Sequence, residues 1–291
     1  MPRPPLPARS AWLPALLHAL AEDLGTGDAT TRAVLPEDVR IEAVIEAREP
    51  LVVCGQALAA AVFEALGGVE IDPLVPDGER AAAGAALVGL AGSAHAILAG
   101  ERTALNAFAR SCAVATITRR YVDAVAGTGV SIVDTRKTHP GWRALDKYAV
   151  AVGGGVNHRI GLYDALLVKD NHIAAAGGVA AAVKTARARA PAHLWLQVEV
   201  ESEAAAEEAL AAGADALLLD NRSLQELAAL AARFRDRTQL EASGGVTLAN
   251  VRAVAETGVH RISIGALTHS APNVDVALEV AGWKARGTGR A

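Results

Sequence analysis

The runs that decide the fold are Val130-Ser131-Ile132-Val133, which ends in Asp134-Thr135-Arg136-Lys137, and Ala165-Leu166-Leu167-Val168, which ends in Lys169-Asp170. Apolar runs of this length, rich in aliphatic and β-branched side chains, are typical of buried strands. Charge that directly follows such a run lies at the carboxyl end of the strand. In parallel α/β architectures ligands bind at that end, because the loops after the strands converge there. The pattern therefore predicts an anion-binding active site.

The second half of the chain repeats this alternation of apolar runs and alanine-rich segments. The predicted strands are 131–133, 166–168, 196–200, 216–219, 240–242 and 262–264, with helices such as 202–212 and 223–233 between them. This order is typical of a right-handed parallel βα series. Its simplest closure is a (β/α) barrel, complete or truncated.

Polar residues or glycine follow every one of these runs, and on a parallel sheet they could face one cavity. They are Asp134, Arg136, Lys169, Glu199, Asp220, Ser243 and Gly265. A single such residue is more often a solvated loop charge. Their recurrence in register favours a common site.

Two acids in this set, Glu199 and Asp220, need a cation or hydrogen-bond donors if they are buried. One interpretation is that they bind Mg²⁺ together with a phosphorylated sugar. The alternative is a structural ion pair of the acid with Lys169 or Arg136. The sequence leaves both open.

Two glycine-containing turns follow the last predicted strands and resemble a phosphate site. Ser243-Gly244-Gly245 and Gly265-Ala266, with His269 nearby, present small residues whose backbone N–H groups can approach an oxyanion. The chain contains neither a Walker loop nor a dinucleotide-binding fingerprint, so ATPase and NAD-dependent dehydrogenase functions lose their main support.

The first third predicts a small α+β unit. It contains a helix near 12–24, a strand at 41–45 and a helix at 56–66. Residues 81–100 lack Asp, Glu, Lys and Arg, but their glycines and alanines favour paired strands with a Gly turn over a membrane span. A long helix is predicted from Glu101 toward Val125.

The composition of the 291 residues, 52% hydrophobic and 21% charged with a net charge of −4, predicts a soluble globular protein without a nucleic-acid partner. Cys54 and Cys112 lack metal-ligand spacing and are expected to be buried reduced thiols. Pro14 and His18 interrupt the apolar stretch at the N-terminus, which argues against a signal peptide. A cytoplasmic location is the expectation.

Six motifs together resemble the quinolinate phosphoribosyltransferase family, also called nicotinate-nucleotide pyrophosphorylase (carboxylating). They are Arg102-Thr103-Ala104-Leu105-Asn106, Asp134-Thr135-Arg136-Lys137-Thr138, Gly153-Gly154-Gly155-Val156-Asn157-His158-Arg159, Lys169-Asp170-Asn171-His172, Leu219-Asp220-Asn221 and Ser243-Gly244-Gly245. The resemblance runs from Glu22 to Ser270.

The resemblance implies an α/β fold with an N-terminal α/β sandwich domain, residues 1–112, and an irregular, TIM-like barrel, residues 113–271. It also implies that segment 272–291 packs back on the first domain, with a helix after Asn273. The tail 282–291 is expected to be frayed. A homodimer is implied, in which Arg102 reaches the partner's site.

The implied reaction joins quinolinate to 5-phosphoribosyl-1-pyrophosphate in the presence of Mg²⁺ and releases pyrophosphate and carbon dioxide. The product is nicotinate mononucleotide, an intermediate of de novo NAD biosynthesis. Guanidinium groups suit the two carboxylates of quinolinate.

Carried onto this sequence, the resemblance assigns roles residue by residue. Quinolinate is assigned to Arg102, Arg136, His158, Arg159 and Lys169; pyrophosphate to Lys137; the ribose and Mg²⁺ to Glu199 and Asp220; and the 5-phosphate to Ser243, Gly244, Gly245, Gly265 and Ala266. Thr135, Ile264 and His269 complete the substrate-binding set. Lys137, Lys169, Glu199 and Asp220 are the candidate catalytic residues.

Two other functions compete with this interpretation. One is a paralogous pyrophosphorylase-like enzyme of molybdate-transport operons, which would act on another acceptor. The other is a non-enzymatic anion-binding barrel. The presence of every dicarboxylate-binding cation argues against the first, and the presence of both acids beside those cations argues against the second.

Overall fold

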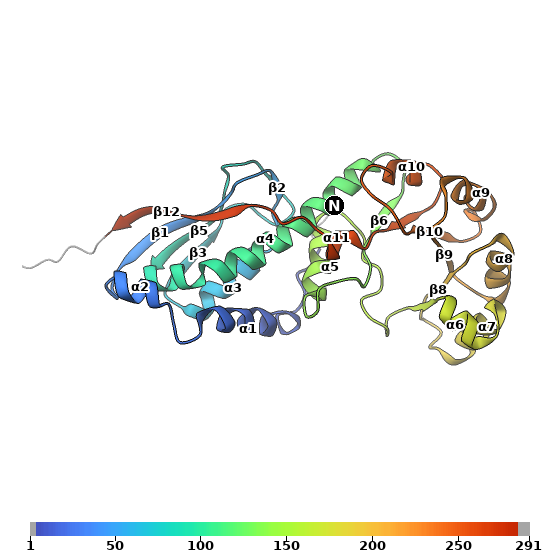
Figure 1. The fold of residues 1–291 in the computed structure, drawn as a ribbon, viewed down its shortest axis with the longest axis horizontal. Helices are drawn as coiled ribbons and strands as arrows, with labels where there is room; N and C mark the ends of the chain where they lie inside the picture. Colours follow the sequence, from blue (N-terminus) through green and yellow to red (C-terminus); the bar gives the residue numbers. More distant parts are fainter. Residues whose placement is uncertain (1–3, 285–291) are drawn as a thin grey trace, which may run out of the picture. The chain divides into compact units, whose positions relative to one another are not determined.

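The structure is a computed structural model that describes residues 4–284. The chain forms two compact units (Figure 1). The first contains the residues up to Arg119, His139–Gly154 and the residues from Ser270 onward, and the second contains Arg120–Thr138 and Gly155–His269.

The first unit is built on a four-stranded antiparallel sheet with the order β12-β1-β5-β3. Its strands are β1 (Arg40–Ala47), β3 (Val69–Pro73), β5 (Ala86–Ser93) and β12 (Val276–Lys284). Alternate residues of β1, from Ile41 to Ala47, are buried, as expected for a sheet with one face on a core. A short ladder joins β2 (Leu51–Val52) to β4 (Arg80–Ala81).

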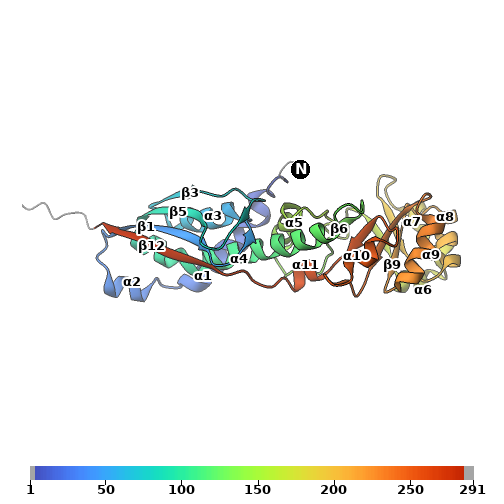
Figure 2. The ribbon, with the colours of Figure 1, turned by 90° about the horizontal axis from the view of Figure 1, so that it is seen from above.

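The helices of this unit supply most of its large core side chains. They are the 3-10 helix η1 (Arg9–Ala11), α1 (Leu13–Leu24), α2 (Ala29–Val34), α3 (Gln56–Leu66), α5 (Arg143–Val152) and the part of α4 (Ala94–Ala124) up to Arg119. Figures 1 and 2 show α1, α3 and α4 beside the sheet. Trp12, Leu16, Phe63, Ile97 and Phe108 are buried.

Two predictions for this unit are wrong, namely the helix after Asn273 and the extension of paired strands over residues 94–100. The segment after Asn273 forms the strand β12 instead of a helix, and Val276 pairs with Ala47 of β1. Antiparallel pairing satisfies backbone groups that β1 would otherwise expose at its edge. β12 also includes residues 282–284 of the tail expected to be frayed, and residues 285–291 lie outside the described residues.

The long helix α4 begins at Ala94, seven residues before the predicted start, so residues 94–100 are helical and not a second strand. The hydroxyl of Ser93 accepts the N–H of Ala96 at 3.4 Å, which provides a helix start that the apolar composition obscured. α4 also continues through the predicted domain boundary at 112/113, and the segment 139–154 belongs to the first unit.

The second unit contains a parallel six-stranded sheet with the order β6-β11-β10-β9-β8-β7. The strands are β6 (Ser131–Val133), β7 (Leu166–Val168), β8 (Leu196–Glu199), β9 (Ala216–Asp220), β10 (Gln239–Ser243) and β11 (Arg261–Ser263). The helices are α6 (Asp170–Ala176), α7 (Val179–Arg189), α8 (Glu203–Ala212), α9 (Leu224–Phe234), α10 (Val251–Ala255) and α11 (Ala266–His269). Each predicted strand is confirmed to within a residue at either end.

The predicted α/β class is confirmed, and the sheet has the truncated form of the barrel. Within residues 4–284 no hydrogen-bonded ladder joins β6 to β7. Val156 forms a parallel bridge to Val133 on the free side of β6. This bridge places the segment that follows Gly155 against the strand that ends in Asp134.

Among the helices of residues 4–284, none combines the length and the apolar character needed to span a bilayer. Cys54 and Cys112 are free thiols and are buried, as predicted.

Candidate active site

A cavity of about 540 Å³ lies at the carboxyl ends of the strands of the second unit. It brings together most of the predicted site: Thr135, Arg136, Lys137, His158, Arg159, Lys169, Asp220, Ser243, Gly244, Gly245, Ile264, Gly265, Ala266 and His269. Residues that are up to 134 positions apart in the chain therefore share one cavity because the parallel strands end on the same side.

Two guanidinium groups in this cavity lie close enough to interact unfavourably. Burial, and then the positive charge of Arg136, lowers the pKa of Arg159. Arg159 Nη1 donates to the carbonyl of Ala165 at 3.0 Å, whereas Nε of Arg136 is buried with no hydrogen-bond partner among the described residues. A pair of half-buried cations in this state would be stabilised by a bound anion.

The loop after β6 fixes the backbone of Lys137. The hydroxyl of Thr135 accepts the N–H of Lys137 at 3.1 Å, and the hydroxyl of Thr268 donates to the carbonyl of Lys137 at 2.8 Å. Asp134, predicted to face the cavity, is instead completely buried. Its carboxylate accepts the N–H of His158 at 2.8 Å and Nδ2 of Asn157 at 2.7 Å, so it holds the next loop in place.

The two glycine turns leave room where a side chain would not fit. Gly244 has φ +87°, and a Cβ at this position would collide with the side-chain amide of Asn221. A Cβ on Gly265 would lie 2.9 Å from Cδ of Lys137 and 3.2 Å from the ring of His269. Both positions therefore require glycine because neighbouring side chains of the cavity pack against the backbone there, and both turns line the cavity.

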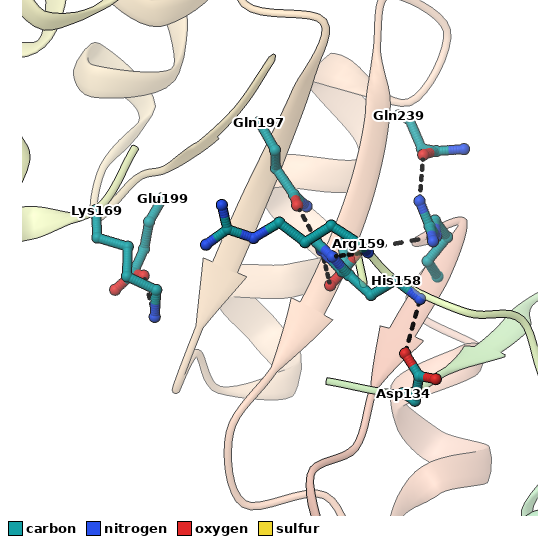
Figure 3. A network of polar contacts seen from close by, with 9 residues as sticks. Asp134, His158, Arg159, Lys169, Gln197, Glu199 and Gln239 are labelled. Atoms are coloured by element: carbon teal, nitrogen blue, oxygen red, sulfur yellow. Dashed lines mark hydrogen bonds and ion pairs between the residues drawn. The ribbon is translucent and has the colours of Figure 1, made fainter. Parts of the chain in front are cut away.

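The two predicted acids differ in their surroundings. Asp220 lines the cavity and accepts Nδ2 of Asn221 at 2.7 Å. Glu199 does not line it; its Oε2 lies 3.4 Å from Nζ of Lys169, and Figure 3 shows the two side chains together. The alternative of an ion pair between Glu199 and Lys169 is therefore confirmed in geometry.

Among residues 4–284 no group of three or more His, Cys, Asp or Glu side chains could hold a metal ion. Asp220 and Glu199 still fit a magnesium ion that takes most of its ligands from a bound polyphosphate and water, because Mg²⁺ commonly uses only one or two protein carboxylates. The Oε2 atom of Glu199, which is buried and accepts no hydrogen bond within the described chain, is suited to that role.

Arg102 does not line this cavity. It belongs to the first unit, where its side chain is 64% exposed and lies 4.0 Å from Glu101. It borders a separate cavity of about 300 Å³ together with Glu22, Asp23 and Trp142.

Sequence reasoning missed several residues of the main cavity. They are Leu167, Leu218, Asn221, Glu241, Val246, Thr247 and Ser263. Strand alternation contained part of the signal, since Leu218, Glu241 and Ser263 each lie two positions before a predicted site residue and so share its face. Asn221 is the single non-glycine residue with positive φ (+53°) among the described residues, which marks a constrained turn beside Asp220.

The fold and the cavity are typical of α/β enzymes whose ligand site lies at the carboxyl ends of a parallel sheet. The chain belongs to the quinolinate phosphoribosyltransferase family. The family model of the quinolinate phosphoribosyl transferase N-terminal domain matches residues 28–112, and that of the C-terminal domain matches residues 114–279.

Relatives cover nearly the whole chain. The probable nicotinate-nucleotide pyrophosphorylase [carboxylating] of Bacillus subtilis is 41% identical over 91% of this chain and 92% of its own. The nicotinate-nucleotide pyrophosphorylase [carboxylating] of Mycobacterium leprae is 42% identical over 90% and 95%. The solved nicotinate-nucleotide pyrophosphorylase of Francisella tularensis has a TM-score of 0.90 and 37% identity over 94% of this chain and 97% of its own.

Proposed function

We propose that the protein transfers the phosphoribosyl group of 5-phosphoribosyl-1-pyrophosphate to quinolinate. Pyrophosphate and carbon dioxide are released, and nicotinate mononucleotide is formed for NAD biosynthesis. The observation that carries this proposal is the cavity itself, which combines the paired guanidinium groups of Arg136 and Arg159 with the glycine turns after β10 and β11. Relatives 41% and 42% identical bear names that state this activity.

Quinolinate would bind at the cationic side of the cavity. Its two adjacent carboxylates match the forked donors of Arg136 and Arg159, and their negative charge would relieve the repulsion between these groups. Lys169 would add a third cation. Recognition by two guanidinium groups would favour a dicarboxylate over nicotinate, which has only one carboxylate.

The sugar phosphate would bind at the part of the cavity that the glycine turns line. Backbone N–H groups of Gly244, Gly245 and Gly265 would hold the 5-phosphate, with the hydroxyl of Ser243. Lys137 would offset the charge of pyrophosphate. Asp220, at the end of β9, would contact the ribose hydroxyls.

Magnesium would be held by the pyrophosphate of the substrate together with Asp220 and Glu199. When bound it would supply positive charge to the leaving pyrophosphate. Glu199 would then exchange its contact with Lys169, at 3.4 Å, for the ion or the ribose.

The reaction needs no nucleophilic side chain. The bond between ribose C1 and the pyrophosphate oxygen breaks, and its electron pair leaves with pyrophosphate. The pyridine nitrogen supplies the pair for the new bond to C1, while the carboxylate of Asp220 stabilises the positive charge that develops on the ribose. The carboxylate next to the nitrogen then leaves as carbon dioxide, because the cationic ring accepts the electron pair until a proton replaces it.

The active assembly would be a homodimer in which Arg102 of each protomer completes the partner's site. The exposure of the Arg102 side chain is compatible with this role. A cytoplasmic location is the accompanying proposal, supported by two buried free thiols, which a reducing compartment preserves.

The test is an assay with quinolinate labelled at the carboxylate next to the ring nitrogen, 5-phosphoribosyl-1-pyrophosphate and MgCl2. We expect labelled carbon dioxide and nicotinate mononucleotide in equal amounts, and no product when nicotinate replaces quinolinate. Product formation from nicotinate at a similar rate, or no reaction with either acid, would contradict the proposal. Omission of MgCl2 with added EDTA tests the metal, and we expect turnover to cease.

A further inference from the structure

The loop that carries His158 and Arg159 contacts three buried side chains to which the proposed reaction gives no role. They are Asp134, Gln197 and Glu241. The backbone of this loop is already fixed, since Asp134 accepts the N–H of His158 and Val156 donates its N–H to the carbonyl of Ile132 at 2.8 Å. The Arg159 guanidinium has a contact of its own, from Nη1 to the carbonyl of Ala165 at 3.0 Å, so the His158 ring is the group of this loop whose support is still to be described.

Both nitrogens of the His158 ring are engaged inside the protein. Nδ1 accepts the backbone N–H of Arg159 at 2.7 Å, and Nε2 lies 2.9 Å from Oε1 of Gln197. Figure 3 shows Gln197 directed at the ring. Since Nδ1 accepts, the ring proton lies on Nε2, which donates to Gln197. The ring thus links the backbone of Arg159 to strand β8.

Glu241 lies on the other side of the same ring nitrogen. Its Oε1 is 3.6 Å from Nε2 of His158, and its Oε2 is 3.7 Å from Nε of Arg261. Gln197 and Glu241 are 0% and 1% exposed. Burial of polar groups is costly where they lack hydrogen bonds, and Nε2 of Gln197 and Oε2 of Glu241 have no hydrogen-bond partner among the described residues. The Oε1 atom of each side chain faces the ring that fixes the start of Arg159.

We propose that Gln197 and Glu241 are positioning residues for the acid substrate. Through the His158 ring and the N–H of Arg159 they fix the start of this residue, and together with the bond from Nη1 to the carbonyl of Ala165 this sets the direction of the Arg159 guanidinium. Glu241 is itself held by Arg261, whose guanidinium lies 5.7 Å from the centre of the Trp195 ring and donates from Nη1 to Oε1 of Gln239 at 3.0 Å. This inference rests on the proposed function, because it assumes that Arg159 binds a carboxylate of quinolinate.

Steady-state kinetics of Gln197→Met test the proposal, because methionine keeps the volume and removes the acceptor. We expect the KM for quinolinate to rise about three- to tenfold, as expected for one lost buried hydrogen bond, while the KM for 5-phosphoribosyl-1-pyrophosphate stays unchanged. The same substitution at the exposed Gln225 of α9 is the matched control and should alter neither constant. Equal increases in both KM values, or an unchanged KM for quinolinate, would overturn the proposal.

Two variants of Glu241 provide a second test. Glu241→Leu should raise the KM for quinolinate selectively, and Glu241→Gln, which keeps an acceptor oxygen beside Nε2, should recover most of the loss. If both variants show the same KM as the parent protein, Glu241 has no positioning role.

Nitrogen NMR of histidine-labelled parent protein gives a readout that needs no substrate and uses a variant only to assign signals. The His158 signals, assigned by their loss in His158→Gln, should show the proton on Nε2 and an unprotonated Nδ1. A proton on Nδ1 would refute the linkage. A parent protein with this tautomer but no activity on quinolinate would instead refute the proposed function alone.

Discussion

Both units bury charge, but they satisfy it differently. In the first unit Asp146 is 2% exposed, and its carboxylate accepts Nη2 of Arg110 at 3.0 Å and the N–H of His139 at 3.3 Å. In the cavity of the second unit, Nε of Arg136 has no hydrogen-bond partner among the described residues, and the charge of Arg136 helps to lower the pKa of Arg159.

This difference separates a structural ion pair from a binding site. A buried acid with its own cation needs no ligand, whereas two half-buried cations that repel each other are stabilised by one. The ligand itself supplies the compensating charge, so the binding free energy includes relief of the repulsion between the guanidinium groups of Arg136 and Arg159. Five substitutions can break or sharpen this comparison.

The largest effect is expected for Arg136→Ala. Loss of a bidentate guanidinium–carboxylate contact should weaken quinolinate binding by about 200-fold, equivalent to about 3 kcal/mol. Titration calorimetry measures the dissociation constant directly. Arg189→Ala, an exposed arginine at the end of α7, is the control and should bind as the parent does. Undiminished binding in Arg136→Ala would remove it from the site.

Arg110→Met is the counterpart in the first unit and should act on stability. It leaves Asp146 buried without its cation, which should lower the free energy of unfolding at pH 7 by about 2 kcal/mol in urea titrations. A loss of less than a few tenths of a kcal/mol would mean that the pair contributes little.

The pH dependence of this variant follows from the carboxyl group. Burial, opposed by Arg110, raises the pKa of Asp146. The folded state therefore binds this proton more tightly than the unfolded chain, so the resulting stability is present below the unfolded pKa and is lost as the pH rises through the raised one. Without Arg110 the pKa should rise further, and the defect of Arg110→Met should shrink toward pH 4. A defect that grows on acidification would contradict this assignment.

A smaller effect is expected for Asp220→Asn, which keeps the shape of the cavity and removes one charge. Turnover should fall about 20-fold because the ribose loses a stabilising carboxylate, and quinolinate binding should stay largely intact. Asp236→Asn, at an exposed position, is the control. Normal turnover in Asp220→Asn would exclude Asp220 from the mechanism.

The smallest effect is expected for Ser223→Ala at the start of α9. The Ser223 hydroxyl accepts the N–H of Glu226 at 3.3 Å, and Glu226 in turn accepts the N–H of Ser223 at 2.8 Å. Loss of this cap should cost about 1 kcal/mol of stability in thermal or urea unfolding. The KM values of Ser223→Ala should not change.

Ser243→Ala should instead raise the KM for 5-phosphoribosyl-1-pyrophosphate several-fold and leave the stability unchanged. A raised KM in Ser223→Ala, or a loss of stability with an unchanged KM in Ser243→Ala, would contradict these assignments.

Local sequence predicted the strands of the second unit because each is a short apolar run that ends in a polar residue or glycine. It failed at β12 and at residues 94–100, where composition suits more than one structure and a distant partner or a single cap decides. The candidate site could be predicted at the residues that follow strands. Strand alternation places Glu241 on the same face as Ser243, but a glutamate inside a strand shows neither its burial nor its neighbours, so its contact with His158 could not be predicted.

The sequence by itself determined the order of strands and helices, the residues at each strand end and the family, because these depend on local patterns and on motif spacing. The tertiary structure alone decided that Glu199 pairs with Lys169, that Asp134 turns inward, and that Gln197 and Glu241 converge on His158. Such contacts depend on side-chain direction and burial across separate strands, and neither is encoded at any one position of the chain.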